Sequence, residues 1–403
     1  MHRSSMNIYF ITDKLLTNKL LTMEFTLQPV KGRGFVNRRE LLEEMIAELK
    51  DRESTTGYAL YGKRRIGKTS VLREVQRRLA EDNKIVTVYF SVWDLIERTV
   101  TEFCQKLSME VIDAHRPHIG LKYRTKELIR TPISLLRKLL DQAEFRVVYD
   151  EIEFFLTFER DIDRNLLVEH TFNLPEKLAD ETDTKCILLL DEFPSIVELK
   201  SNNTMVGEAI LRKIRTLFED WERTTLCISG SIRSTMDLTA LSSMSPFYRQ
   251  LIAKEIRPLG KDAVRELLLR NLEIPEEGVE RIYEFSAGIP FYVQFIGKML
   301  ERKTELTPEV IGEITDEFLK EEGDILFREE FESLSPKERL IIISVAMGCH
   351  KPKEIAGYVA DKVSNVSRFL MYLEEKGHIS RREKGYYVLE DPVFGMWLRG
   401  RSL

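Results

Sequence analysis

Residues 60–72 read LYGKRRIGKTSVL and contain a glycine-bearing loop that ends in a lysine and a threonine. The stretch from Gly62 to Thr69 matches the pattern GxxxxGK[ST] at every fixed position. In such a loop the backbone N–H groups point inward at phosphate oxygens, and the following helix adds its dipole. Lys68 would neutralise charge on the β- and γ-phosphates, and the Thr69 hydroxyl would coordinate Mg²⁺. The predicted nucleotide-binding set in this loop is Gly62, Lys63, Arg64, Arg65, Ile66, Gly67, Lys68, Thr69 and Ser70.

A second group of chemistry-bearing residues ends the apolar run LLLDE, in which Asp191 and Glu192 are the two acids. Asp191 is predicted to hold Mg²⁺, directly or through water, and Glu192 to orient and polarise the attacking water. An apolar strand that ends in two acids is by itself common and usually structural. Its occurrence together with the phosphate loop favours catalysis, with Glu192 and Lys68 as catalytic residues.

The next apolar run ends in Ser229-Gly230-Ser231, which should emerge beside the acid-bearing strand. Its hydroxyls are predicted to lie near the γ-phosphate as a sensor, and the alternative is a simple turn. Arg233, predicted to be catalytic, and Arg249 are candidates for stabilising the charge that develops in phosphoryl transfer. The alternative for each arginine is a surface ion pair. No NKxD-like guanine-reading motif is present, so ATP or ADP is the expected nucleotide.

The elements around these motifs alternate between apolar strand patterns and amphipathic helical patterns. Continuous apolar runs bounded by polar residues are typical of buried parallel strands, and alternation with helices predicts a doubly wound α/β sheet of the P-loop class. The segment 144–159 is compatible with either a hairpin or a strand. The predicted strands are 57–62, 84–94, 184–196 and 224–234, and the predicted helices are 38–50, 70–82, about 95–143, 164–180 and 205–222.

The C-terminal third changes character. From residue 258 to about 330 only helical patterns occur, which predicts a helical lid, and the last part predicts three helices followed by a hairpin, the order of a winged helix. The expected division is therefore an N-terminal tail (1–30), a P-loop ATPase core (31–257), a lid (258–330) and a winged-helix domain (331–403). Residues 1–22 are expected to be a loose tail or a mis-assigned start.

Composition excludes several classes of protein. The chain has 403 residues, 43% hydrophobic and 32% charged, which is typical of a folded globular protein with more than one domain. Its four cysteines are far apart and fit neither a metal site nor a disulfide framework, so a reducing cytoplasm is expected. No run is long and apolar enough to predict a membrane span. The net charge of −5 gives no general reason to expect nucleic acid, so such contact would need a local patch.

Several stretches together resemble the archaeal-type predicted ATPases of the STAND group, within the AAA+-like P-loop class, over about residues 31–403. The resemblance implies that Val36 and Arg38 lie near the nucleotide, and that Gly288 and Pro290 bring the lid towards its base and phosphates. Asn37 stands where that family usually has a glycine. The stretches that carry the resemblance are FVNRREL, GKRRIGKTSVL, VYFSVWD, ILLLDEFPSI, CISGSIRSTM, SPFYRQL and SAGIPFYV.

Residues 331–403 hold 12 Lys or Arg and 9 Asp or Glu, a net charge of +3 within a chain of −5. In a winged helix the third helix enters the major groove of double-stranded DNA and the wing contacts the backbone. Many winged helices instead dock within their own chain or onto a partner protein, and that alternative stays open. The candidate DNA-binding residues are Lys362, Ser364, Asn365, Ser367, Arg368, Arg381, Arg382 and Lys384.

The resemblance implies a slow ATPase switch, closed with ADP and rearranged with ATP, whose lid and winged helix respond to the γ-phosphate. The expected partners are nucleotide with Mg²⁺, double-stranded DNA or a protein partner, and possible self-association. One alternative is an initiator-like DNA-binding protein in which ATP is mainly structural, although GKRRIGKT lacks the small-residue loop of that group. Another alternative is an inactive scaffold, against which the intact Lys68, Thr69, Asp191 and Glu192 argue.

Overall fold

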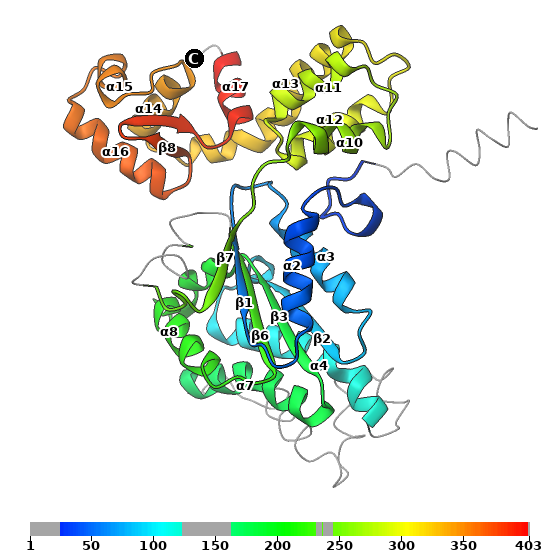
Figure 1. Cartoon of the computed structure of the whole chain (residues 1–403). Coiled ribbons are helices and arrows are strands. Elements are labelled where there is room, and N and C mark those ends of the chain that lie inside the picture. The colour runs from blue at the N-terminus through cyan, green and yellow to red at the C-terminus, as the bar shows by residue number, and fades with distance from the viewer. Residues whose placement is uncertain (1–24, 123–162, 231–235, 237–244, 402–403) are drawn as a thin grey trace, which may run out of the picture. The chain divides into compact units, whose positions relative to one another are not determined.

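The computed structural model describes residues 25–122, 163–230, 236 and 245–401 (Figure 1). These residues form two compact units. The core unit comprises Arg38–Arg64 and Lys68–Ile256, and the C-terminal unit comprises the described residues before Arg38, together with Arg65–Gly67 and those from Arg257 on.

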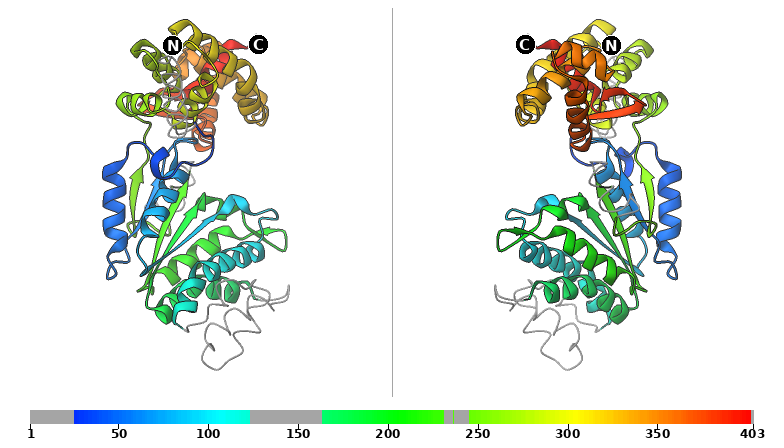
Figure 2. Two further views of the ribbon diagram at one scale, coloured as in Figure 1. Left: turned by 90° about the vertical axis from the view of Figure 1, so that its right-hand side faces the viewer. Right: turned by 90° about the vertical axis from the view of Figure 1, so that its left-hand side faces the viewer.

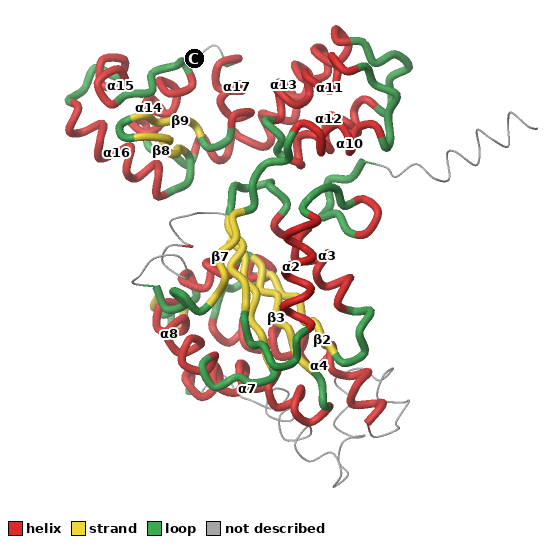
Figure 3. The backbone as a smooth tube through the Cα atoms, in the orientation of Figure 1, coloured by secondary structure: helices red, strands yellow, loops and turns green. Residues whose placement is uncertain are grey.

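A five-stranded parallel sheet in the order β2-β3-β6-β1-β7 forms the centre of the core unit (Figure 3). Every residue of β3 and of β6 is buried, which explains why both were visible as uninterrupted apolar runs. The strands are β1 (Gly57–Tyr61), β2 (Ile85–Ser91), β3 (Lys185–Asp191), β6 (Thr224–Gly230) and β7 (Leu251–Glu255).

Helices cover both faces of this sheet, so the predicted doubly wound fold is confirmed (Figure 2). The helices α2 and α3 pack together on one face, and α4, α7 and α8 pack in a row on the other. Phe90, Phe103 and Phe172 lie in the core beneath the second layer. The helices are α2 (Arg39–Lys50), α3 (Lys68–Leu79), α4 (Val100–Lys122), α7 (Arg164–Thr182) and α8 (Gly207–Phe218).

Two features of the core unit were not predicted. Only Leu251 of the strand β7 is buried, and the strand includes Lys254 and Glu255, so its short sequence is not a continuous apolar run. A small antiparallel hairpin, β4 (Lys200–Ser201) with β5 (Thr204–Met205), follows the turn η4 (Phe193–Glu198), where the polar sequence gave no strand signal. The segment 144–159, predicted as a hairpin or strand, lies outside the described residues.

The C-terminal unit is helical up to residue 332, as predicted for a lid. The long helix α13 runs through the expected lid boundary at residue 330 and ends two residues later. These helices are α10 (Lys261–Leu269), α11 (Glu276–Ser286), α12 (Pro290–Leu300) and α13 (Pro308–Glu332).

Residues 336–389 give the predicted element order of three helices and an antiparallel hairpin. A further helix, α17 (Pro392–Gly400), was not predicted and packs Phe394 and Trp397 against Phe327 of α13. The elements are α14 (Pro336–Ala346), α15 (Pro352–Tyr358), α16 (Val363–Glu375), β8 (Ile379–Glu383) and β9 (Tyr386–Leu389). Across the described parts of both units, no helix combines the length and the apolarity that crossing a membrane requires.

Candidate functional site

The loop after β1 has the backbone that a phosphate-binding loop needs. Gly62 has φ +150°, and a Cβ added there would lie 2.4 Å from the carbonyl oxygen of Ile256. Ile256 N in turn donates to the carbonyl oxygen of Tyr61, which holds the start of the loop against the strand end. Gly62 is therefore required by both conformation and space. Arg65 and Gly67 also have positive φ, at 63° and 89°.

Lys68, the first residue of α3, is almost fully buried. Its ammonium donates to the carbonyl oxygens of Gly62 (3.1 Å) and Lys63 (2.9 Å). Burial lowers the pKa of Lys68 to about 8, and the nearby carboxylates of Glu192 and Asp191 oppose that shift. A buried ammonium that is short of negative charge is suited to receive phosphate oxygens.

Asp191 is the centre of the polar cluster at the carboxyl edge of the sheet. Its Oδ2 accepts a hydrogen bond from Thr69 Oγ1 at 2.6 Å, and its Oδ1 accepts from Ser229 Oγ. The strand order places β6 between β3 and β1, so the three polar groups meet at adjacent strand ends. Thr69, Asp191 and Ser229 therefore lie together at this edge of the sheet.

The Thr69 and Asp191 oxygens fit a magnesium ion. Within the described ranges, no three His, Cys, Asp or Glu side chains are grouped to hold a metal by themselves. Mg²⁺ in phosphoryl-transfer sites requires only one or two protein oxygens, because phosphates and water supply the others. A hydroxyl and a carboxylate 2.6 Å apart form such a donor set.

Glu192 follows Asp191 in the left-handed conformation, with φ 48°. Its backbone N–H donates to Asp191 Oδ1 at 3.2 Å, and its side chain is half-buried. Glu192 is the residue between the end of β3 and the start of η4, so the backbone changes direction directly after Asp191. The separate roles of the two carboxylates stay predictions.

The other predicted phosphate-sensing residues are only partly within the described chain. Ser229 is buried and its hydroxyl is turned to Asp191, so its role as a γ-phosphate sensor stays a prediction. Ser231 and Arg233 lie outside the described residues. Arg249 has φ 61°, and its guanidinium lies 5.3 Å from the ring centre of Tyr248.

Sequence reasoning missed Tyr89 on β2. Its hydroxyl donates to Asp191 Oδ2 at 2.8 Å, the same oxygen that accepts from Thr69. Burial, and then the charge of Asp191, raise the pKa of Tyr89 well above its usual range, so the phenol stays a neutral donor. The signal was present in the sequence, because β2 and β3 are parallel and Tyr89 pairs with Leu189, two residues before the aspartate.

The FVNRREL motif has an unusual backbone. Asn37 and Arg38 both have φ 61°, and Arg38 is the N-cap of α2. Asparagine tolerates this left-handed conformation better than most residues, which explains how it can replace the usual glycine. Val36 is buried, and burial lowers the pKa of Arg38 to about 10.

The SAGIP motif forms the turn between α11 and α12. Gly288 has φ +71°, and a Cβ there would lie 2.1 Å from the carbonyl oxygen of Leu259. Pro290 begins α12 at a position that needs no N–H donor. The contribution of Gly288 and Pro290 to nucleotide binding remains a prediction.

The Arg65 side chain is engaged within the C-terminal unit. Its Nη1 donates to the Tyr292 hydroxyl and to Asp391 Oδ2, each at 3.2 Å. The guanidinium also lies 5.3 Å from the ring centre of Phe327. Asp391 is the N-cap of α17, and burial raises its pKa. One residue of the phosphate-loop motif is thus bonded to α12 and to the start of the last helix.

The candidate DNA-binding residues lie on α16, at its N-cap Lys362, and in the β8–β9 hairpin with its turn. Most of them are exposed, whereas Asn365 is half-buried and donates to Asp361 Oδ1 at 3.1 Å. Arg381 and Arg382 are on β8, and Lys384 is in the turn after it. The exposed members are Lys362, Ser364, Ser367, Arg368, Arg381, Arg382 and Lys384.

Comparison with known proteins agrees with this site. The family model of an ATPase domain found predominantly in archaea matches residues 35–296. An uncharacterized ATP-binding protein of Methanocaldococcus jannaschii is 22% identical over 320 residues, covering 74% of this chain and 76% of that protein.

Solved structures share the fold. A Walker-type ATPase of Pyrococcus abyssi superimposes with a TM-score of 0.70 at 21% identity, over 94% of this chain and 100% of that chain. The ORC2 protein of Aeropyrum pernix, in its ADPNP–ADP complexes, gives a TM-score of 0.57 at 13% identity, over 94% of this chain and 96% of that chain. Each comparison therefore extends over most of this chain.

Proposed function

The chain belongs to a family of ATPase domains found predominantly in archaea, and we propose that this ATPase is a Mg²⁺-dependent switch. Its nucleotide state would be relayed through the lid helices to the winged-helix region. The chain is an ATP-binding P-loop ATPase, and the proposal concerns how hydrolysis is organised and what it controls. Assignment to the STAND group is part of the same proposal.

The hydrolytic roles follow from the cluster around Asp191. Lys68 supplies a buried positive charge for the phosphates, and Thr69 with Asp191 would hold Mg²⁺. When bound, the ion would neutralise charge on the phosphate oxygens. Glu192, which follows Asp191 at the end of β3, would orient and polarise the attacking water.

The observation that carries the switch proposal is the position of the Arg65 side chain. Arg65 lies in the phosphate loop three residues before Lys68, and its guanidinium bonds Tyr292 of α12 and Asp391 at the start of α17. Phosphates that reshape the loop would act on Arg65 through the backbone. The contact therefore supports a route from the nucleotide to the last helix.

The proposed output is contact with double-stranded DNA or a partner protein. The exposed side chains of α16 and the arginines of β8 support DNA, because they combine hydrogen-bonding groups with positive charge. In the alternative, an initiator-like protein, DNA binding would not depend on which nucleotide is bound.

Two measurements test the proposal. Trp397 of α17 can be made the sole tryptophan by Trp93→Phe and Trp221→Phe, because the chain has three tryptophans. Its fluorescence should differ between ADP and a non-hydrolysable ATP analogue, and Arg65→Ala should abolish the difference. Lys50→Ala, which removes an exposed positive charge of α2 outside the phosphate loop, is the control and should preserve the difference.

Binding of labelled duplex DNA at about 100 mM salt is then compared with ADP, with the analogue and without nucleotide. A nucleotide-dependent affinity supports the switch acting on DNA. Equal binding in all three states favours the initiator-like alternative, and no binding in any state removes DNA as the output. If Trp397 fluorescence were also insensitive to nucleotide, the relay itself would be wrong.

A further inference from the structure

Two side chains of helix α3 and two of the central sheet contact one another in a ring that includes Asp191. Thr69 and Arg73 are four residues apart on α3, so they project from the same face of that helix. Tyr89 and Asp191 share a face of the sheet, because Tyr89 pairs with Leu189 and side chains alternate along a strand. Thr69 bonds Asp191, Asp191 accepts from Tyr89, and Arg73 lies over the Tyr89 ring.

The two donors to Asp191 Oδ2 differ in what else they do. Thr69 is itself a proposed metal ligand, so its hydroxyl has a second use in the site. The Tyr89 hydroxyl, at 2.8 Å, has Asp191 as its hydrogen-bond partner among the described residues. Tyr89 can therefore hold the Asp191 carboxylate in one orientation while the Thr69 hydroxyl coordinates the metal.

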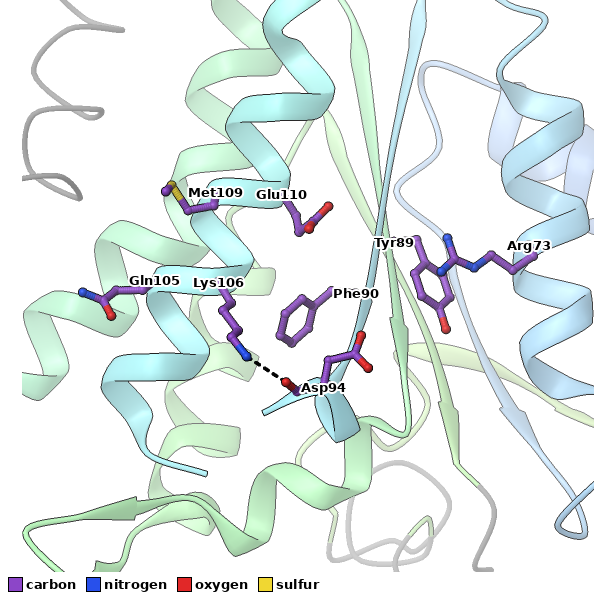
Figure 4. A pocket seen from close by; sticks show the side chains of 8 residues that line it. All are labelled: Arg73, Tyr89, Phe90, Asp94, Gln105, Lys106, Met109 and Glu110. Carbon is purple, nitrogen blue, oxygen red and sulfur yellow. Dashed lines mark hydrogen bonds between the residues drawn. The ribbon is translucent and has the colours of Figure 1, made fainter. Parts of the chain in front are cut away.

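The Tyr89 ring is not surrounded by core side chains, so another contact must fix its orientation. It borders a pocket of about 650 Å³ beside the edge strand β2, and it is only half-buried. Figure 4 shows Tyr89 and Arg73 together on one side of β2, with Phe90, Lys106 and Glu110 on the other. The Arg73 guanidinium lies 3.3 Å from the ring centre, so a planar cation covers one face of the ring.

We propose that Tyr89 is a positioning residue for the metal-binding carboxylate of Asp191, and that Arg73 acts through Tyr89 by fixing its ring. Neither residue touches the reacting atoms. Partners that orient a metal ligand commonly change metal affinity when they are removed. This inference rests on the Mg²⁺-dependent ATPase proposed above.

The first test is Tyr89→Phe, which keeps the ring and its contact with Arg73 and removes only the hydroxyl. Mn²⁺ serves as the metal probe, and its free concentration is measured by electron paramagnetic resonance with the ADP-loaded protein. Half-saturation should need roughly tenfold more Mn²⁺ than in the parent protein. Affinity for ADP without metal should stay within about twofold, because Lys68 and the loop are unchanged.

The matched control is Tyr58→Phe, which removes a buried tyrosine hydroxyl from β1 of the same sheet. Tyr58 faces Glu44 and Glu48 of α2, so this change should leave Mn²⁺ binding unaltered. Arg73→Lys keeps the charge and removes the planar contact. It should weaken Mn²⁺ binding in the same direction as Tyr89→Phe, but less.

The double variant distinguishes the proposed route from direct electrostatics. If Arg73 acts through Tyr89, adding Arg73→Lys to Tyr89→Phe should produce no further loss. Additive losses would overturn the role given to Arg73. A Mn²⁺ titration of Tyr89→Phe that superimposes on that of the parent would overturn the role of Tyr89. A parent protein without metal-dependent binding would overturn the magnesium proposal and this inference together.

Discussion

Thr69 Oγ1 donates a hydrogen bond to Asp191 Oδ2 at 2.6 Å, which joins the end of the phosphate loop to the end of β3. The two residues are 122 positions apart in the chain. Parallel strands bring them together, because β1 and β3 are both followed by their functional residues at the same edge of the sheet. The contact ties the phosphate-binding and hydrolytic parts of the site into one cluster.

Substitution of Lys68 by Ala should strongly weaken nucleotide binding. The change removes a buried charge that would face the phosphates, and such losses cost about 3 kcal/mol, or roughly a hundredfold in affinity. Calorimetric titration with ADP measures the effect. Lys50→Ala is the control, because Lys50 is an exposed cation at the end of α2 and lies outside the phosphate loop. Retention of parental affinity by Lys68→Ala would contradict the assignment of Lys68.

Substitution of Glu192 by Gln should separate binding from hydrolysis. Glutamine keeps the size and hydrogen bonding of the side chain but cannot polarise water as a base, so kcat should fall by roughly 10²- to 10⁴-fold. ADP affinity should stay within about twofold, since Glu192 is not a proposed phosphate ligand. Phosphate release and ADP titration measure the two quantities. Turnover at the parental rate would mean that another group activates the water.

Much of this site could be predicted because its signals are local in the sequence. The loop motif and the two acids after an apolar run are each recognisable from a short stretch of sequence. The predicted parallel sheet then indicates that Thr69 and Asp191 lie close together. Tyr89 could have been found from the strand register, but only once β2 and β3 were known to be neighbours. The bonds of Arg65 to Tyr292 and Asp391 depend on how helices far apart in sequence pack, and no local pattern encodes that.

The fold shows the same division. The strands β3 and β6 are fully buried and were predicted from their apolar runs. The strand β7 is a short edge strand with only its first residue buried, and it was not predicted. Helix α17 was missed because nine residues between a hairpin and the C-terminus give a weak periodic signal. Its role depends on the aromatic contacts of Trp397 with α13, which are tertiary.

Replacement of Arg381 and Arg382 by Ala should weaken DNA binding for all sequences and flatten its salt dependence. Both arginines are exposed on β8, where a wing would meet phosphates. Two lost phosphate contacts should reduce the slope of log affinity against log salt by about 2. Fluorescence anisotropy at several salt concentrations gives this slope.

The control for the wing variant is Arg302→Ala, which removes one exposed positive charge from the loop after α12. It should leave the salt slope unchanged, because the slope depends on the number of phosphate contacts and not on the net charge of the protein. An unaltered slope in the Arg381/Arg382 variant would show that the wing does not contact the DNA backbone.

The core unit should lose stability in mild acid through His115. This histidine is fully buried on α4, its Nδ1–H donates to the carbonyl oxygen of Val111, and burial lowers its pKa to about 4. Since the pKa is about 6.5 in the unfolded chain, that state binds more protons between pH 4 and 6.5. Stability is thus complete above about pH 6.5, and about 3 kcal/mol is lost as pH falls to 4. Urea unfolding across this range should show a shallower loss in His115→Gln than in the parent or in His170→Gln, and equal slopes in all three would exclude His115 as the cause.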